Sequence, residues 1–369
     1  MKVVLLAAGG RAGSDFFHSL IDGHPEILQF PGYLRVNKLK PILNYDTHIK
    51  IAKTFIKSFP EFFDSRNEKF ERWDKLGQNK NKHFKINKKK FISSFIKISK
   101  KKNSFNKLEI IKNLHFSYFK AKGDKKEKKI LFIHTHLLSW TKLFIKITGL
   151  KEFEILHTIR HPLAAINSNL RTWLTFQNGA HYFPKDLYYH LDKICNCINN
   201  LIKLNKKKKV HIVQLEKLHL ENKEFMIDFC KKFKIKYKYC LCKSTKNGLK
   251  WWGDMGTKKW ISGINKNFKI KINEKYFYKR DLIFFQNLTI DIAKKYNYQL
   301  MYPKKNIYFN FLPMKCEIMI WRNTIKHLFY KGFRWKHLLS IPFFYFKRNL
   351  LLNKILINNR YKILPSSIG

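Results

Sequence analysis

The sequence predicts an α/β protein in which a parallel sheet is flanked by helices. Short apolar segments alternate with longer segments of helical periodicity along much of the chain, and a glycine-rich turn directly follows the first apolar segment. The chain has 369 residues, of which 45% are hydrophobic, so it can bury a substantial core. We expect one α/β domain over residues 1–300 and a C-terminal extension over residues 301–369.

The N-terminal segment predicts a phosphate-binding turn. Apolar residues 3–8 form a predicted strand, the turn at 9–15 contains three glycines, and residues 16–21 have a helical pattern. A turn of this kind directs free backbone N–H groups toward one point, where phosphate binds. The Gly-Lys-Ser/Thr motif of nucleotide kinases and the Gly-x-Gly-x-x-Gly motif of dinucleotide-binding folds are both missing from it. The sequence therefore predicts a phosphorylated small molecule as ligand.

Residues 61–128 predict a helical insertion. The segment is rich in lysine, but Phe91, Phe95 and Ile98 keep helical spacing, as do Phe116 and Phe119 further on. We therefore expect helices here rather than a disordered linker.

The alternation of strands and helices resumes after the insertion. Parallel strands joined by helices place their carboxyl ends at one edge of the sheet, where ligands bind. The predicted strands are 129–134, 153–159 and 210–214, and the predicted helices are 138–147, 163 into the 170s, 185–205, 224–233 and 281–298.

The C-terminal extension combines large aromatic residues with lysine and arginine. This pattern fits a helix lying on an anionic membrane surface through residues 320–350. It also fits amphipathic helices packed on the domain or on a second subunit. Both interpretations stay open at the level of sequence.

The net charge of +50 suggests an anionic partner, such as nucleic acid or a membrane. However, the lysines are spread along the whole chain and accompany many Asn, Ile and Phe residues, as A+T-rich coding would produce. We therefore expect a solvated lysine surface and no nucleic-acid partner.

The six cysteines and the N-terminus favour a cytoplasmic protein without a metal site. The cysteines form no Cys-x-x-Cys pair, so we expect reduced thiols. The apolar start is too short for a signal peptide, and no apolar run is long enough for a spanning helix.

Three motifs at predicted strand ends resemble the donor site of the sulfotransferases that use 3′-phosphoadenosine 5′-phosphosulfate (PAPS). The first is the turn with Arg11, Gly13 and Ser14 after a strand. The second is the strand, His-Pro turn and helix at 155–169. The third is the segment 130–137, whose His-Thr-His-Leu is similar to the Lys-Thr-His-Leu of hydroxyl-transferring members. The resemblance covers residues 1–300 and suggests a P-loop-like sheet and a bacterial, carbohydrate-type enzyme.

The resemblance implies which residues bind the donor. The turn would hold the 5′-phosphate, an arginine and a serine eight residues apart would hold the 3′-phosphate, and the late segment 247–259 would close over the nucleotide. Ordinary packing is the alternative for the two tryptophans of that segment. The implied donor-binding residues are Arg11, Ala12, Gly13, Ser14, Asp15, Arg160, Ser168, Trp251, Trp252 and Lys258.

The resemblance also implies three catalytic residues. His136 would take the proton of the acceptor, because neutral imidazole is a suitable base near neutral pH. Arg11 would neutralise charge on the bridging oxygen, and His134 stands where the family has lysine. Asp15 departs from the usual Ser or Thr, and its carboxylate would repel phosphate unless it turns away or contacts Arg11.

These observations predict a PAPS-dependent sulfotransferase that acts on a hydroxyl group of a carbohydrate or similar acceptor and uses no metal. We expect it in the cytoplasm, with the inner face of the cytoplasmic membrane as a candidate peripheral location. Two alternatives are a nucleotide-dependent kinase and a non-catalytic basic protein that binds nucleic acid or a membrane surface.

Overall fold

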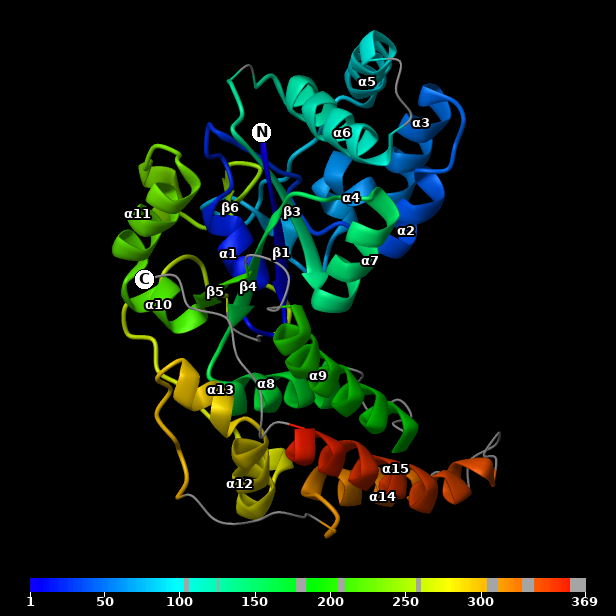
Figure 1. The fold of residues 1–369 in the computed structure, drawn as a ribbon, viewed down its shortest axis with the longest axis vertical. Coiled ribbons are helices and arrows are strands. Elements are labelled where there is room, and N and C mark those ends of the chain that lie inside the picture. The colour runs from blue at the N-terminus through cyan, green and yellow to red at the C-terminus, as the bar shows by residue number, and fades with distance from the viewer. Residues whose placement is uncertain are drawn as a thin grey trace.

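The sheet has five parallel strands in the order β2-β3-β1-β4-β5 (Figure 1). The strands are β1 (Lys2–Ala8), β2 (Ile27–Leu28), β3 (Ile130–Leu137), β4 (Glu154–Ile159) and β5 (Val210–Gln214). Helices flank this sheet, which confirms the predicted fold class. The computed structural model describes residues 1–102, 106–124, 126–176, 184–204, 210–256, 260–303, 311–326 and 335–358.

Both faces of the sheet are buried, which explains why its strands are continuously apolar. Leu5 of β1 belongs to an apolar cluster with residues of α3 (His48–Ser58) and α7 (Leu138–Thr148). Leu6 belongs to a cluster on the opposite face, with residues of α1 (Ser14–Leu20) and α11 (Asn222–Phe233). The central strand therefore lies in the middle of the core, and its carboxyl end is rigidly placed.

The long helices of the insertion lie in its part from residue 88 onward. Helices α5 (Lys88–Lys102) and α6 (Lys107–Lys122) confirm the spacing of its phenylalanines. The helical prediction is wrong for most of residues 64–87, where the only helical turns are η1 (Ser65–Asn67) and η2 (Trp73–Lys75). This stretch is held by the buried side chain of Trp73 and by a backbone bridge between Leu76 and Lys82. Long-range burial rather than local periodicity decides its shape.

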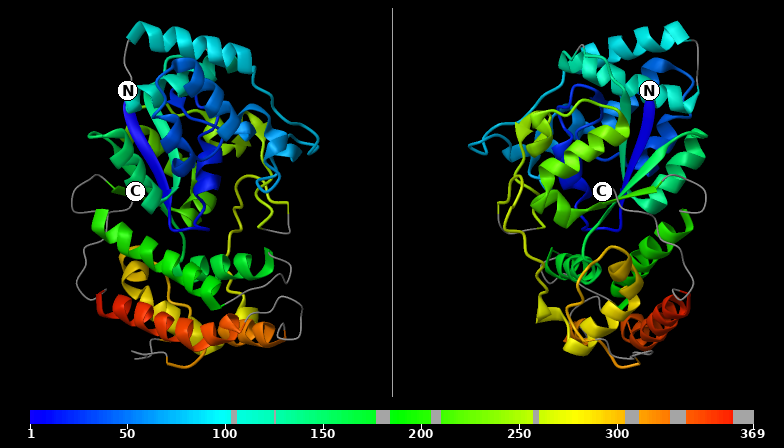
Figure 2. Two further views of the ribbon diagram at one scale, coloured as in Figure 1. Left: turned by 90° about the vertical axis from the view of Figure 1, so that its right-hand side faces the viewer. Right: turned by 60° about the vertical axis from the view of Figure 1, so that its left-hand side comes forward.

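A helical layer lies beyond the carboxyl ends of the strands (Figures 1 and 2). It has its own apolar cluster, which includes Leu170, Phe284 and Leu352. The predicted helix 281–298 is divided at Thr289, whose backbone is not helical. The helices of this layer are α8 (Pro162–Phe176), α9 (Pro184–Leu204), α12 (Lys279–Leu288), α13 (Ile290–Lys295), α14 (Lys315–Lys326) and α15 (Lys336–Asn358).

The C-terminal helices pack on the rest of the molecule, with α15 running along α9 and contacting α14 and α12. The expectation of amphipathic helices packed on the domain is therefore correct for their inner faces. Among the described residues, no helix combines the length and the apolar character that crossing a bilayer requires. The remaining elements are α2 (Val36–Ile42), α4 (Pro60–Phe63), α10 (Leu215–Leu220), η3 (Tyr239–Cys242), η4 (Glu274–Tyr276) and the hairpin of β6 (Thr245–Lys246) and β7 (Leu249–Lys250).

Candidate active site

The glycine-rich turn leaves β1 in a conformation that requires glycine. Gly10 and Gly13 have φ of 80° and 83°, and Arg11 between them has φ of 50°. A Cβ on Gly13 would lie 2.5 Å from Cδ1 of Leu215, and a Cβ on Gly10 would lie 2.9 Å from Nδ2 of Asn169. The turn is therefore pressed between the end of β5 and helix α8, and its backbone is fixed on both sides.

Arg11 is paired with an acid from the late segment. Its Nη1 lies 2.7 Å and its Nη2 3.4 Å from the carboxylate oxygens of Asp254. The backbone N–H of Met255 donates to the carbonyl of Phe70 at 2.8 Å, so this segment is also attached to the insertion. The late segment therefore lies against the turn, and the Asp254 carboxylate is the partner of the Arg11 guanidinium.

Arg160 lies at the carboxyl end of β4, on the same side as the turn. It lines a cavity of about 70 Å³ together with Gly9, Gly10 and Ala12. Its Nε is buried and has no hydrogen-bond partner among the described residues. Burial lowers the pKa of Arg160, the carboxylate of Glu216 opposes this, and the positive charge of Arg11 lowers it further. Arg11 itself does not line this cavity, but its charge acts on Arg160, so the two arginines lie within electrostatic range of each other.

The acid nearest to Arg160 is already hydrogen-bonded elsewhere. The two oxygens of Glu216 accept from the backbone N–H of His161 at 2.8 Å and from the hydroxyl of Tyr298 at 2.9 Å. These bonds leave the Arg160 guanidinium available to a ligand. An open cleft of about 750 Å³ is lined in part by Glu216 itself, together with Lys217, Phe268 and Tyr298.

Of the neighbouring residues Ser168 and Asn169 on α8, only Asn169 lines the Arg160 cavity. Ser168 is buried, but it does not line the Arg160 cavity. Asn169 lines that cavity and lies against Gly10. Sequence reasoning missed Asn169, although its place on the same helix, one residue after the expected serine, was a usable signal.

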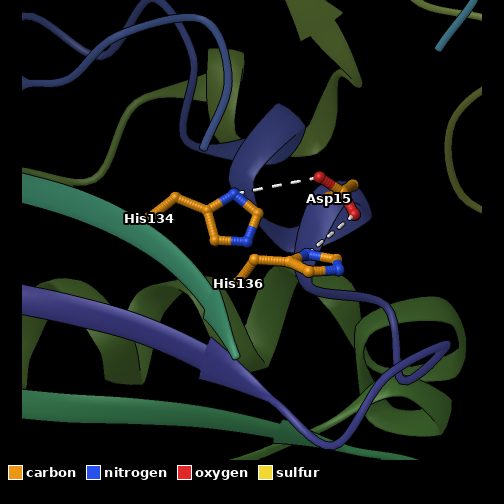
Figure 3. Close-up of side chains that lie close together, drawn as sticks. All are labelled: Asp15, His134 and His136. Atoms are coloured by element: carbon orange, nitrogen blue, oxygen red, sulfur yellow. Dashed lines mark ion pairs between the residues drawn. The ribbon is translucent and has the colours of Figure 1, made fainter. Parts of the chain in front are cut away.

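Asp15 turns toward the two histidines of β3 (Figure 3). Its Oδ1 lies 3.8 Å from Nδ1 of His134, and its Oδ2 lies 3.8 Å from Nδ1 of His136. Burial favours the neutral acid, but the neighbouring histidines, Lys246 and Arg11 together lower the pKa of Asp15. Asp15 is therefore a carboxylate that faces imidazole rather than the Arg160 cavity.

The two histidines have different surroundings. The His134 side chain is fully buried, and burial lowers its pKa to about 3, so it is neutral at pH 7. His136 is 29% exposed at its side chain, has φ of 65° and stacks on the ring of Tyr33 at 4.8 Å. A non-glycine residue in this conformation is strained and held by its surroundings. Of the two, His136 is the one that a substrate can reach.

Asp15, His134 and His136 also form a possible metal-ligand set, since their ligand atoms all lie within 4.8 Å of one another. Two imidazoles and a carboxylate suit zinc or iron. However, Arg11 and Lys246 both act on Asp15 as positive charges. These two positive charges oppose the binding of a metal cation at the same carboxylate.

Lys246 is a buried cation that sequence reasoning missed. It is 1% exposed, its Nζ donates to the carbonyl of Pro31 at 3.1 Å, and it lies 4.9 Å from the centre of the Trp251 ring. Glu71 lies within its electrostatic range, and burial together with Asp15 raises the pKa of Glu71 well above its usual value. In a chain with 75 lysines and arginines, only burial distinguishes Lys246 from the surface lysines.

The two tryptophans of the late segment are attached to the insertion. The indole N–H of Trp251 donates to the carbonyl of Glu71 at 2.7 Å, and that of Trp252 donates to the carbonyl of Gly77 at 2.7 Å. Trp251 is buried in the main core, and neither tryptophan lines the Arg160 cavity. The packing alternative fits this arrangement better than stacking on adenine. Lys258 lies outside the described residues.

The fold is similar to two solved sulfotransferase domains. One is the sulfotransferase domain from the Synechococcus PCC 7002 olefin synthase, with a TM-score of 0.42, 12% identity and coverage of 81% of this chain and 96% of that chain. The other is the sulfotransferase domain from the curacin biosynthetic pathway, with a TM-score of 0.36, 16% identity and coverage of 83% and 94%. No protein-family model and no curated protein sequence matches the chain. TM-scores this low say nothing about which residues form the site.

Proposed function

We propose that this protein is a sulfotransferase that moves a sulfuryl group from PAPS to a hydroxyl group of a carbohydrate or similar acceptor. The observation that supports this most is that Arg11 and Arg160 follow the adjacent parallel strands β1 and β4 and lie within electrostatic range of each other. A donor with phosphates at both ends requires two such cations on the same side of the sheet.

The donor would lie across the strand ends. The turn and Arg11 bind the 5′-phosphosulfate, and Arg160 with Asn169 binds the 3′-phosphate. The Arg160 cavity, at about 70 Å³, is too small for a nucleoside, so we place the nucleoside in the larger cleft that includes His161, the residue after Arg160. Because Asp254 pairs with Arg11, donor binding includes an exchange of that carboxylate for phosphate.

The chemical step is an in-line displacement at sulfur. The acceptor oxygen forms a bond to sulfur, the bond from sulfur to the bridging phosphate oxygen breaks, and the phosphate leaves with the electron pair. Arg11 stabilises the charge that develops on the leaving oxygen. His136 takes the proton of the acceptor hydroxyl, and the Asp15 carboxylate orients the ring and stabilises the imidazolium.

The test of this assignment is transfer of labelled sulfate from PAPS to a panel of soluble hydroxyl compounds. We expect His136→Ala to abolish transfer while the affinity for adenosine 3′,5′-bisphosphate stays within about two-fold, because His136 acts on the acceptor. A conservative Asp15→Asn variant should bind donor and show a pH profile of transfer displaced from that of the parent. Retained transfer by His136→Ala would assign the base elsewhere, with Glu71 as the next candidate.

Two other functions make different predictions. A nucleotide-dependent kinase would be stabilised by ATP with magnesium and would hydrolyse or transfer its γ-phosphate. A non-catalytic nucleic-acid-binding protein would bind DNA in a salt-dependent manner that Arg160→Ala leaves unchanged. We propose a cytoplasmic location.

A further inference from the structure

Helix α15 presents a row of large apolar side chains to solvent. Leu339, Phe343, Phe346 and Leu350 are 72%, 53%, 63% and 56% exposed, and Trp335, just before the helix, is 71% exposed. At about 100° per residue, these positions fall within an arc of roughly 80° on one side of the helix. A single exposed leucine needs no explanation, but a continuous row of aromatic and aliphatic residues on one helix indicates a binding surface.

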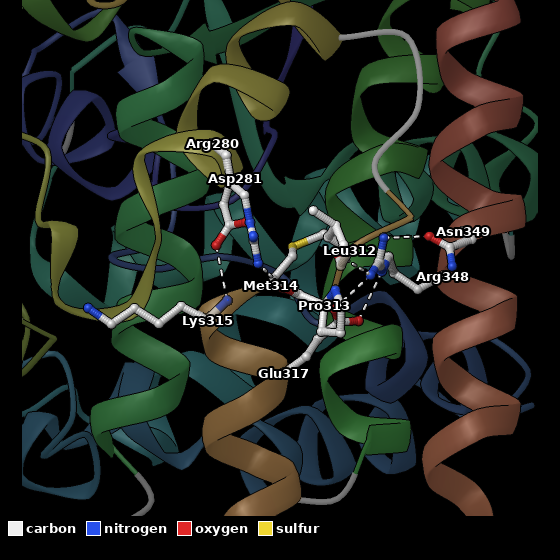
Figure 4. A network of polar contacts seen from close by, with 9 residues as sticks. All are labelled: Arg280, Asp281, Leu312, Pro313, Met314, Lys315, Glu317, Arg348 and Asn349. Atoms are coloured by element: carbon white, nitrogen blue, oxygen red, sulfur yellow. Dashed lines mark hydrogen bonds and ion pairs between the residues drawn. The ribbon is translucent and has the colours of Figure 1, made fainter.

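A buried ion pair fixes the rotation of the helix, so the exposure of this row is built into the fold (Figure 4). Arg348 is 1% exposed and bonds to both carboxylate oxygens of Glu317 on α14, at 2.9 and 2.7 Å. It also donates to the side chain of Asn349 and to the carbonyl of Leu312. Because Arg348 lies on the opposite side of α15 from the apolar row, this pair turns the row outward.

Three exposed lysines flank the row on one side. Lys336, Lys347 and Lys354 are all exposed, and they fall about 60–80° from the middle of the row on the same helix. Nζ of Lys347 lies 4.4 Å from the centre of the Phe343 ring. Helix α15 contains no acidic residue. The outward face of α15 therefore combines an apolar row with a positive margin.

We propose that this face of α15 binds the surface of a membrane that contains anionic lipids. Aromatic and aliphatic side chains enter the boundary between head groups and acyl chains, and lysines remain at the head groups. A second copy of the chain is a poorer partner, because it brings the same positive margin and the same net charge of +50 to the contact. The helix lies on the far side of α9 from the sheet, so it can contact a membrane without covering the strand ends (Figure 2).

The test is co-sedimentation of the full chain with vesicles of phosphatidylcholine alone or with a third of phosphatidylglycerol. We expect binding to the anionic vesicles and weak binding to the neutral ones. The Phe343→Ser, Phe346→Ser double variant should bind at least ten-fold more weakly, and Lys347→Glu about five-fold or more. The matched control is Leu220→Ser with Tyr239→Ser, two exposed apolar residues on other elements, which should bind as the parent does.

Two outcomes would overturn the proposal. Equal binding of the double variant and the parent would show that adsorption is due to charge alone. A parent that is dimeric in light scattering and a monomeric double variant would assign the face to a second copy. Retained thermal stability of the variants excludes unfolding as the cause. The measurement needs no donor or acceptor, so its failure and that of the sulfotransferase proposal are distinguishable.

Discussion

Replacement of Arg160 by alanine tests the donor site most directly. In the folded protein its Nε is buried without a partner among the described residues, so its desolvation has already occurred before the donor arrives. The acid beside it, Glu216, keeps its bonds from His161 and Tyr298 when the guanidinium is removed. The substitution should therefore weaken donor binding and leave the fold intact.

The expected size follows from the charge-assisted bond that is lost. Hydrogen bonds to charged groups contribute about 1.5–3 kcal/mol, which corresponds to a loss of roughly 10- to 150-fold in affinity. At a concentration of adenosine 3′,5′-bisphosphate 100 times its Kd, the parent gains about 2.7 kcal/mol of stability. A variant with 100-fold weaker binding would gain about 0.4 kcal/mol at the same concentration. For a chain of 369 residues, the shift in Tm should fall from about 3.5 °C to about 0.5 °C.

Thermal unfolding and calorimetric titration measure both quantities, and Arg66→Ala is the matched control. Arg66 is an exposed arginine paired with Asp64 in the insertion, so its removal should leave nucleotide binding unchanged. Arg160→Lys should recover only part of the affinity, because lysine cannot make the bidentate contact. If Arg160→Ala binds as tightly as the parent, or if ATP with magnesium stabilises equally, the assignment of this region to the donor is wrong.

The remaining predictions concern stability and are measured by urea unfolding. The pKa of His134 is about 3, well below the ordinary value of 6.5, so the unfolded chain takes up a proton that the folded chain does not. Its contribution to stability should fall by about 2 kcal/mol between pH 7 and pH 5, and His134→Gln should remove this part of the fall. Arg348→Met should cost about 3–5 kcal/mol because it leaves Glu317 buried and unpaired, and adding Glu317→Met should restore most of it. Gly13→Ala should cost about 2–4 kcal/mol, since its Cβ would meet Leu215 in a left-handed conformation; a loss under 1 kcal/mol would contradict the rigid turn.

Most of the sheet was predictable because its strands are buried on both faces. Continuous apolar segments ending in glycine, proline or polar residues mark β1, β3, β4 and β5 without any tertiary information. The edge strand β2 has two residues, too few for a pattern, and it forms because Ile27 and Leu28 pair with the start of β3. The same reasoning failed over 64–87, since the shape of that stretch depends on partners far away in the sequence.

The positions of the candidate site residues were predictable at strand ends and unpredictable where loops supply them. Arg11 follows β1, Arg160 follows β4, and His136 lies near the carboxyl end of β3. These strands are consecutive in the sheet order β3-β1-β4, so the parallel topology alone brings the three residues to one edge. Asp254 comes from the late segment and Lys246 from strand β6 directly before it, and the positions of both depend on long-range contacts. No spacing rule predicts such contacts. Asp15 was noted as a departure, but its orientation toward the histidines required the structure.

The attachments of the late segment indicate how a donor can enter without unfolding the site. Trp251 and Trp252 are bonded to carbonyls of the insertion, and Asp254 is bonded to the turn through Arg11. The Arg11–Asp254 pair is 23% and 17% exposed at its side chains, so a phosphate can reach Arg11 and replace the carboxylate as its charged partner, whereas Trp251 is buried and bonded. A phosphate that replaces Asp254 therefore opens one contact and leaves the two tryptophan anchors in place. The Asp254→Asn variant should therefore bind the donor more tightly than the parent, because the phosphate no longer competes with a carboxylate for Arg11.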